Sequence, residues 1–488
     1  MITKASLLPI AISLVVGLLT GFNIDASIGM YPVLVVMTIL VLISQRLPIV
    51  NTFAIMFSVA TMGIMIAQHE SSVNRGYDYE GTMSQCKVVV MSEPTEKAKS
   101  VEVDVVNIAD GSKLKCYLQK DSSAAALAPG NCLDIVARFN AATGYLLHHD
   151  YAGRCYVKSE NWQWCEGNAL ASENSRKVLG NISRITRLKL MFMQWRHVIL
   201  KHYKKLDISG DAYAVVAAMT LGDKTALNRS LRDTYAVSGA SHILALSGMH
   251  LGIICSVLML VTASRRQRSV WSQTLLVISI WGFALLVGLP TSVVRSALMI
   301  SLFAVLSLGY RQNISVNSLC VAAIVILLCS PYAIYDTGFQ LSFAAVFSIV
   351  TLLPFFAPRY KPLSFVKGCV LVSLAAQIGV APIIAYHFGS LSTYFLLTNI
   401  VAIPAAYIII CGALLMMVFP PLSVIVVFAA NTLNSLLGYI TKMPLASIEG
   451  LHPSIVQVAL YYVLVAILMA AYCLRKGYYP ESLNRWDS

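Results

Sequence analysis

The sequence predicts a polytopic α-helical membrane protein that carries one small external β domain. Of its 488 residues, 57% are hydrophobic and only 12% are charged, whereas a soluble protein carries roughly 25% charged residues. Long apolar runs recur along the chain and are interrupted by one polar segment with strand-like alternation. The two patterns predict a membrane-spanning helical unit and a separately folded β unit.

About 12 apolar runs are candidate membrane spans, three before the polar segment and nine after it. They cover 5–22, 31–44, 51–67, 239–261, 270–288, 291–309, 313–330, 339–357, 366–386, 392–418, 420–440 and 452–474. Basic residues fall in alternate loops, for example Arg265, Arg266 and Arg268 in one loop and Arg475 and Lys476 after the last run. Cytoplasmic loops carry the excess of Lys and Arg. We therefore expect a multi-pass protein of the bacterial inner membrane with both termini in the cytoplasm.

The polar segment, residues 71–175, carries 10 basic and 13 acidic side chains. It predicts four short strands, at 87–91, 101–107, 113–119 and 133–139. Asp110-Gly111 is a hairpin signal between the second and third strands. These features favour a small barrel outside the membrane. Its slight negative charge is more typical of a scaffold or gate than of a primary nucleic-acid binder.

Five of the 11 cysteines fall in this segment, and none of their spacings matches a CxxC zinc motif. In an oxidising compartment they would form one or two disulfides and leave a spare thiol, with the pairing open. The candidates are Cys86, Cys116, Cys132, Cys155 and Cys165.

Residues 176–206 predict an amphipathic helix with nine basic and no acidic side chains. Its expected apolar face contains Val178, Ile182, Ile185, Leu188, Phe192, Trp195, Ile199, Tyr203 and Leu206. Such a helix can lie on the membrane surface and bind lipid phosphates, or form a basic collar that collects a polyanion at a pore mouth. The candidate DNA or lipid phosphate contacts are Arg184, Arg187, Lys189, Arg196, Lys201, Lys204 and Lys205.

The stretch 238–253 combines two histidines with several small residues and opens the apolar run that ends at Val261. Hydrogen-bonding groups are costly inside a bilayer, so those found there are candidate functional groups. The alternative is that the histidines only satisfy neighbouring carbonyls near the membrane surface. The candidate pore residues in this stretch are Ser241, His242, Ser247, Gly248 and His250.

More polar groups lie in or beside later runs, and we add Arg295, Asp336, Gln340, Gln377, His387 and Asn399 to the candidate pore residues. Arg295 and Asp336 are expected to form an ion pair, either an architectural clamp or part of a transport site. Pro382 and Pro404 suggest broken helices, which transport proteins use near polar groups. We expect a wet, polar-walled conduit near His242 and Arg295.

No hydrolytic constellation in the sequence is convincing. There is no GxxxxGK[ST] phosphate loop, no HExxH metal motif and no GxSxG nucleophile motif. We therefore expect no cofactor, no metal site and no catalytic residues.

Three sequence blocks resemble, in their order along the chain, the signature of the ComEC family. They are residues 221–254 (LGDKTALNRSLRDTYAVSGASHILALSGMHLGII), 335–346 (YDTGFQLSFAAV) and 375–404 (AAQIGVAPIIAYHFGSLSTYFLLTNIVAIP). This family comprises membrane DNA-uptake proteins of competent bacteria. The resemblance covers nearly the whole chain. Full-length relatives often carry a carboxy-terminal metallo-β-lactamase-like domain, which this chain, ending at Ser488, is expected to lack.

The resemblance implies an OB-like β domain and a membrane pore for one strand of transforming DNA. The implied partners are single-stranded DNA, membrane lipids, a periplasmic DNA receptor, a cytoplasmic ATPase or helicase, and a separate nuclease. Two alternatives stay open, a membrane-embedded enzyme acting on a lipid or envelope substrate and a structural platform for an envelope complex. The expected divisions are 1–70 (first spans), 71–175 (β domain), 176–235 (basic helix and connector), 236–476 (channel domain) and 477–488 (cytoplasmic tail).

Overall fold

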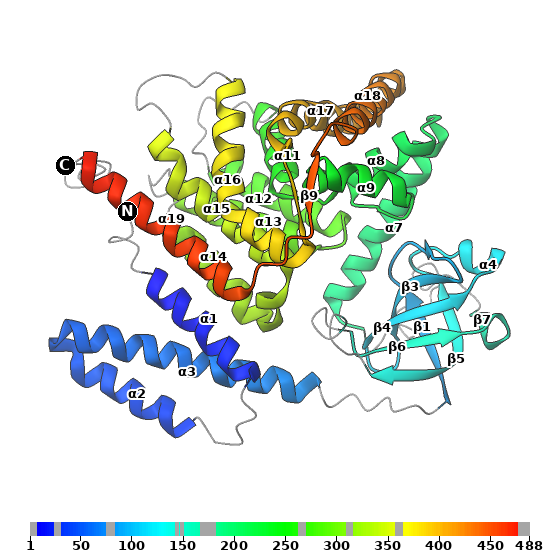
Figure 1. Ribbon diagram of the computed structural model, residues 1–488. Helices are drawn as coiled ribbons and strands as arrows, with labels where there is room; N and C mark the ends of the chain where they lie inside the picture. The colour runs from blue at the N-terminus through cyan, green and yellow to red at the C-terminus, as the bar shows by residue number, and fades with distance from the viewer. Residues whose placement is uncertain are drawn as a thin grey trace.

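A small β barrel lies beside a large helical unit in the computed structural model, and α7 runs between them (Figure 1). The structure describes residues 7–23, 31–74, 83–141, 146, 151–165, 182–261, 270–308, 316–356 and 365–476. Arg265, Arg266, Arg268 and the expected tail 477–488 fall outside the described residues, so the predicted orientation of the termini stays a prediction.

The barrel is closed by five strands, in the order β1-β3-β4-β6-β5 with β5 pairing back to β1. The seven strands of its sheet are β1 Met83–Val90, β2 Thr95–Glu96, β3 Ser100–Asn107, β4 Lys113–Gln119, β5 Cys132–Ala141, β6 Gly153–Val157 and β7 Trp162–Trp164. The four predicted strands correspond to β1, β3, β4 and β5 and are confirmed. Only β4 and β6 pair in parallel; the other pairings described in this sheet are antiparallel.

Alternation of buried and outward residues explains why these segments form strands. In β3, Val101, Val103 and Val105 are buried in the barrel core while the residues between them point outward. The predicted hairpin at Asp110-Gly111 is confirmed, because Gly111 takes a positive φ of 75° and joins β3 to β4.

Among the described residues, six helices are long and apolar enough to cross a membrane, namely α3 and α15 to α19, and seven apolar helices are shorter. The structure therefore supports a membrane protein, and the number of twelve spans stays a prediction. The helices are α1 Leu8–Asn23, α2 Tyr31–Ile43, α3 Pro48–Asn74, α4 Ser122–Ala125, α7 Arg184–Lys205, α8 Gly210–Leu221, α9 Arg229–Val237, α10 Ser241–Leu244, α11 Gly248–Val261, α12 Val270–Leu286, α13 Thr291–Leu308, α14 Val316–Cys329, α15 Thr337–Phe356, α16 Phe365–Phe388, α17 Phe395–Met416, α18 Ser423–Thr441 and α19 Ile455–Lys476.

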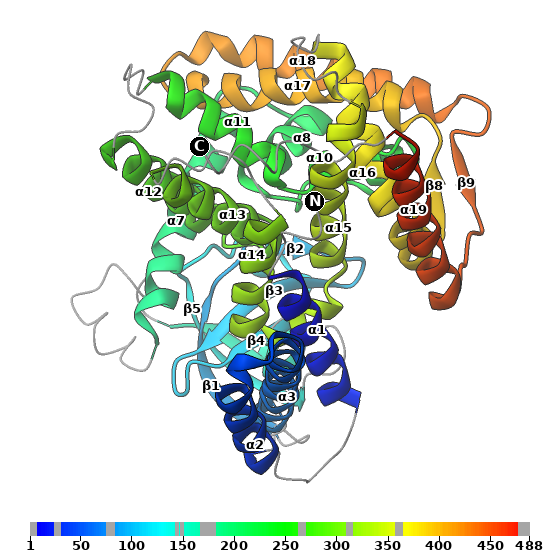
Figure 2. The ribbon, with the colours of Figure 1, turned by 90° about the vertical axis from the view of Figure 1, so that its left-hand side faces the viewer.

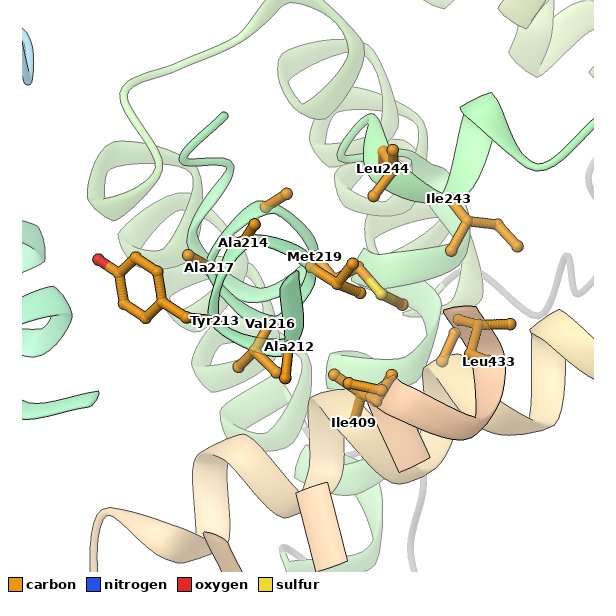
Figure 3. Close-up of a cluster of buried hydrophobic side chains, with 14 of the residues drawn as sticks. Ala212, Tyr213, Ala214, Val216, Ala217, Met219, Ile243, Leu244, Ile409 and Leu433 are labelled. Carbon is orange, nitrogen blue, oxygen red and sulfur yellow. The ribbon is translucent and has the colours of Figure 1, made fainter. Parts of the chain in front are cut away.

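The short α8 is the centre of the largest hydrophobic core (Figure 3). Its residues from Ala212 to Leu221 are all buried, and they pack against α17, α18 and α10. Small alanines at 212, 214, 217 and 218 allow the neighbouring helices to approach closely. In Figure 2, α17 and α18 lie at the end of the molecule opposite the hairpin of α2 and α3.

The predicted helix breaks at Pro382 and Pro404 are wrong, because α16 and α17 run through both prolines. A proline removes one backbone donor and frees the carbonyl four residues earlier. At Pro382 that carbonyl belongs to Ile378, and it accepts a 3.2 Å hydrogen bond from the Tyr461 hydroxyl of α19. A side chain from a neighbouring helix thus replaces the missing donor, which sequence spacing could not show.

Candidate functional site

The apolar run 239–261 is interrupted, contrary to the single membrane-length segment that the sequence predicts. Helix α10 ends at Leu244, Ala245 is extended with φ −85° and ψ 124°, and α11 begins at Gly248. The carbonyl of Ser247 accepts from the backbone N–H of His250 at 3.0 Å. In return, Nδ1 of His250 accepts from the Ser247 backbone N–H at 3.2 Å and lies 3.1 Å from its hydroxyl. The contact from the His250 ring back to the Ser247 N–H corresponds to one half of a capping box, with histidine in place of the usual glutamate.

The same contacts fix the tautomer of His250. A backbone N–H can only donate, so Nδ1 must accept and the ring proton lies on Nε2. The side chain is fully buried; Nε2 makes no hydrogen bond of normal geometry within the described residues, but the Ile243 carbonyl is close enough to act as its acceptor. Backbone groups therefore face both ring nitrogens of His250, whereas the His242 side chain is exposed and lies 3.1 Å from the Gly239 carbonyl.

Hydrogen bonds from two later helices hold the interrupted stretch in place. Ser292 at the start of α13 donates to the Leu246 carbonyl at 2.6 Å. Thr398 near the start of α17 donates to the Ser238 carbonyl at 2.7 Å. Gly239 has a φ of 83° and lies against Ser392, so a side chain there would be strained and would clash. These contacts satisfy backbone groups that a continuous helix would have paired internally.

The predicted ion pair between Arg295 and Asp336 is confirmed, with 3.0 Å between the guanidinium and carboxylate groups. Arg295 is only 2% exposed. Asp336 also accepts from the Thr291 hydroxyl at 3.0 Å and from the Gly338 backbone N–H at 3.0 Å. It follows the 3-10 helix Pro331–Tyr335 and precedes α15, so it caps α15 and does not share a helical face with Gln340. The alternatives of clamp and transport site both fit this geometry.

Gln340 links α15 to two other elements. Its side-chain amide donates to the Ile334 carbonyl at 2.9 Å, and its carbonyl oxygen lies 2.8 Å from Nε2 of the exposed His387, near the end of α16. Asn399 instead donates to Ser373 at 3.0 Å, and Gln377 lies half-buried on α16. The structure thus connects Gln340 and His387 directly.

Three pairs of predicted polar residues meet near helix ends: Ser247 with His250, Arg295 with Asp336, and Gln340 with His387. The contacts join the starts of α11, α13 and α15 and the end of α16 through successive hydrogen bonds. We call this group the helix-end site; its residues are Ser241, His242, Ser247, Gly248, His250, Arg295, Asp336, Gln340 and His387.

A groove of about 700 Å³ opens elsewhere, between α7, α11, α12 and α17. Its lining is almost entirely apolar and contains neither His242 nor Arg295. This groove is therefore not the polar-walled conduit expected from the sequence, and that conduit stays a prediction.

The basic helix α7 differs from the sequence expectation in its limits and in its buried face. It begins at Arg184, with Ser183 as its N-cap, and the preceding residues 176–181 lie outside the described residues. The face that packs against protein consists of Leu190, Met193, Arg196, Leu200 and Tyr203. Of the residues expected on the apolar face, Ile185, Leu188 and Trp195 are exposed, and Phe192 and Ile199 line the groove.

Arg196 is not a surface phosphate contact, contrary to the prediction. It is 8% exposed and lies 3.7 Å from the buried carboxylate of Asp223, just after α8. Burial lowers the pKa of Arg196, and Asp223 opposes that shift. Lys189 and Arg187 are also half-buried, which leaves Arg184, Lys201, Lys204 and Lys205 as the exposed basic residues among the candidates.

Four of the five barrel cysteines come together in two pairs. Cys116 and Cys155 are opposite each other on β4 and β6, with their buried sulfur atoms 2.9 Å apart. Cys132 and Cys165 are also in side-chain contact, and burial raises the pKa of the Cys132 thiol to about 12. Cys86 is left over, and burial raises the pKa of its thiol to about 12. All five are thiols in the structure.

Sequence reasoning missed an aromatic platform on the outer face of the barrel. Tyr117 of β4 and Tyr156 of β6 stack with 4.9 Å between ring centroids and 18° between ring planes. Arg138 of β5 pairs with Tyr156 in register, and Arg154 is two residues before it, so both arginines flank the tyrosines. All four are outward positions of their strands, a signal that the alternation pattern could have provided.

Within the described ranges, no group of three or more His, Cys, Asp or Glu side chains is placed to hold a metal ion.

The sequence profile of the competence protein family matches residues 219–475, which is more than half of the chain. The chain belongs to the competence protein family. The match includes α11 and all the later helices, and with them every residue of the helix-end site.

Two similar proteins support this family assignment. The chain is 28% identical over 300 residues to ComE operon protein 3 of Bacillus subtilis (strain 168), covering 60% of this chain and 38% of that protein. It is 26% identical over 224 residues to competence protein ComA of Neisseria gonorrhoeae, covering 43% of this chain and 31% of that protein. The chain thus spans less than half the length of these competence proteins. No solved structure shows significant similarity.

Proposed function

We propose that this competence-family protein lies in the inner membrane and provides the path by which single-stranded DNA enters the cytoplasm. The observation that carries this proposal is the aromatic platform, Tyr117 and Tyr156 with Arg138 and Arg154. Proteins bind single strands by stacking bases on aromatic rings and by attracting the backbone with positive charge. Both elements occur together on one outer face of the barrel.

The local charge of this face matters more than the net charge of the β domain. Glu102 and Asp104 on neighbouring β3 are each within 3.5 Å of the Lys115 amine. That amine neutralises part of their charge, so the side of the platform toward β5 and β6 is basic. A polyanion can therefore approach the tyrosines, although the domain as a whole is slightly acidic.

The helix-end site supports the membrane part of the proposal. It interrupts an apolar helix and places the exposed His242 beside backbone groups that Ser292 and Thr398 hold in place. Irregular backbone at membrane depth is tolerated where it is buried in protein or lines a water-filled cavity. Arg295 is paired and buried, so in this proposal it positions α15 and does not contact the strand directly.

The proposed partners follow from what the passage of a strand requires. A receptor outside the membrane would deliver the DNA, and a cytoplasmic ATPase or helicase would pull the strand, because the sequence contains no phosphate loop. A separate nuclease would supply the single strand.

Deletion of the gene, followed by measurement of uptake of fluorescent DNA, tests the proposal. We expect uptake to stop and to return with the wild-type gene. Normal uptake in the deletion strain would contradict the proposal. It would favour the enzyme or platform alternatives, which product analysis and assembly assays would then separate.

Binding of labelled oligothymidylate to the purified full-length protein tests the platform. Replacing both Tyr117 and Tyr156 with alanine should weaken binding by about tenfold or more, since each stacked base contributes ~1–3 kcal/mol. The matched control is Trp164→Ala, another exposed aromatic residue of the same barrel, on β7. Equal affinities for the wild type and the double variant would exclude the platform as a DNA contact.

A further inference from the structure

We propose that the apolar groove beside α7 is a binding site for one acyl chain of an anionic phospholipid, whose phosphate is held by basic residues at the end of α7. The groove has a volume of about 700 Å³, within the range of ~300–1,000 Å³ typical of ligand sites. Four helices contribute to it, and eleven of its twelve lining residues are apolar. The proposal is independent of DNA uptake.

The groove opens toward the surface along one stripe of α7. Trp195 is 52% exposed and Val198 is 64% exposed, yet both line the groove. The opposite side is closed by buried or half-buried residues of α11 and α12, including Ile254 and Phe283. An open, apolar hollow in a membrane-spanning unit fits a hydrocarbon chain better than a polar ligand.

The charge of α7 determines which lipid fits. Between Arg184 and Lys205 the helix contains seven Lys or Arg residues and no acidic residue. Lys205 is seven residues after Val198, so it lies on the same helical face about two turns further along. At 1.5 Å per residue this separation is about 10 Å, within the length of one lipid molecule. Exposed Lys201 adds a second ammonium group to the same end of the helix.

Gly282 of α12 is a position at which a substitution can fill the groove. It lines the groove, and a Cβ at this position would meet no atom within 4 Å. A large side chain at position 282 can therefore occupy the groove without displacing backbone. Gly438 of α18 is also free of neighbours within 4 Å and does not line the groove, so it provides a matched control.

The experiment measures lipid binding by full-length protein from vesicles of equal parts phosphatidylglycerol and phosphatidylcholine. Native mass spectrometry counts retained lipid. We expect the wild type to retain phosphatidylglycerol in preference to phosphatidylcholine. Gly282→Phe should retain about tenfold less, because it displaces two or three methylene groups of the chain. Gly438→Phe should behave like the wild type.

Two further measurements distinguish binding of the acyl chain in the groove from binding of the lipid headgroup by α7. Phosphatidylglycerol with brominated acyl chains should quench wild-type tryptophan fluorescence, and Trp195→Phe should reduce that quenching, while Trp271 and Trp281 of α12 account for the remainder. Replacing Lys201 and Lys205 with glutamine should lower the preference for phosphatidylglycerol about tenfold while chain-dependent quenching persists. Lys99 and Lys158, exposed on the barrel, supply the control double replacement.

Equal lipid retention by the wild type and Gly282→Phe would overturn the groove as the site. Equal retention of the two lipids by the wild type would overturn the assignment of an anionic headgroup. DNA uptake is not a readout here, so these outcomes are distinguishable from a failure of the proposed function.

Discussion

The hydroxyl of Tyr461 donates a 3.2 Å hydrogen bond to the carbonyl of Ile378, the backbone group freed by Pro382. The adjacent Tyr462 hydroxyl donates to the Gly379 carbonyl at 2.6 Å. Gly379 differs because its carbonyl can still accept from the backbone N–H of residue 383 within the continuous helix. The two tyrosines of α19 therefore make similar hydrogen bonds, but only Tyr461 supplies a donor that the helix itself lacks.

Tyr461→Phe should destabilise the protein by about 1–3 kcal/mol, because it leaves the Ile378 carbonyl without a donor in an apolar setting. Tyr462→Phe, the matched control, should cost less. Thermal unfolding in detergent measures both. In the background Pro382→Ala, which restores the backbone donor, the cost of Tyr461→Phe should shrink. Equal costs for the two tyrosine variants would contradict this account.

The pair of Arg295 and Asp336 predicts an asymmetry between its two partners. Asp336→Asn should cost about 3 kcal/mol or more, since it leaves a guanidinium that is 2% exposed without its counter-charge. Arg295→Met should cost less, because Asp336 is more exposed and keeps its donors on Thr291 and Gly338. Denaturation of both single variants and the double variant measures the coupling. A larger loss from Arg295→Met would refute the argument.

The two thiol pairs of the barrel should become disulfides when the barrel faces an oxidising compartment. Each would form by exchange with an oxidised dithiol oxidoreductase, which gains two thiols for every new bond. Peptide mass spectrometry of protein from the native membrane should show Cys116 linked to Cys155 and Cys132 linked to Cys165. Cys86 should remain free. A disulfide that includes Cys86, which lies near Cys116 and Cys155 in the same core, would contradict this pairing.

The free thiol Cys86 should react slowly with alkylating agents below pH 9, since burial raises its pKa from 9.0 to about 12. Because the raised pKa favours the protonated form in the folded barrel, the associated stability is complete below pH 9. It is lost as the pH rises from 9 toward 12. Alkylation rates and thermal midpoints of the wild type and Cys86→Ser between pH 8 and 10 test this. Cys86→Ser should show the weaker pH dependence of the midpoint, and identical slopes would exclude Cys86 as the cause.

Much of the architecture follows from local pattern. Apolar runs identified most of the apolar helices, and alternation with the Asp110-Gly111 turn identified four barrel strands, because these features depend on residues close in sequence. The short β6 and β7 were missed, since strands of five and three residues give too little alternation to detect.

The sequence alone determined the class of the protein, a helical membrane unit with one small barrel. It also located the polar residues within or beside apolar runs, where burial of a polar group costs free energy. What only the tertiary structure decided is how those groups are satisfied. Ser247 and His250 interrupt a helix that its apolar composition would have continued, whereas Tyr461 preserves one at Pro382. Arg196, on a basic helix, is buried against Asp223 from a different segment. Tyr461 and Asp223 come from segments distant in sequence, and Ser292 and Thr398 of later helices hold the stretch that Ser247 and His250 interrupt. The free energy that decides these conformations therefore depends on contacts between distant segments as well as on local sequence.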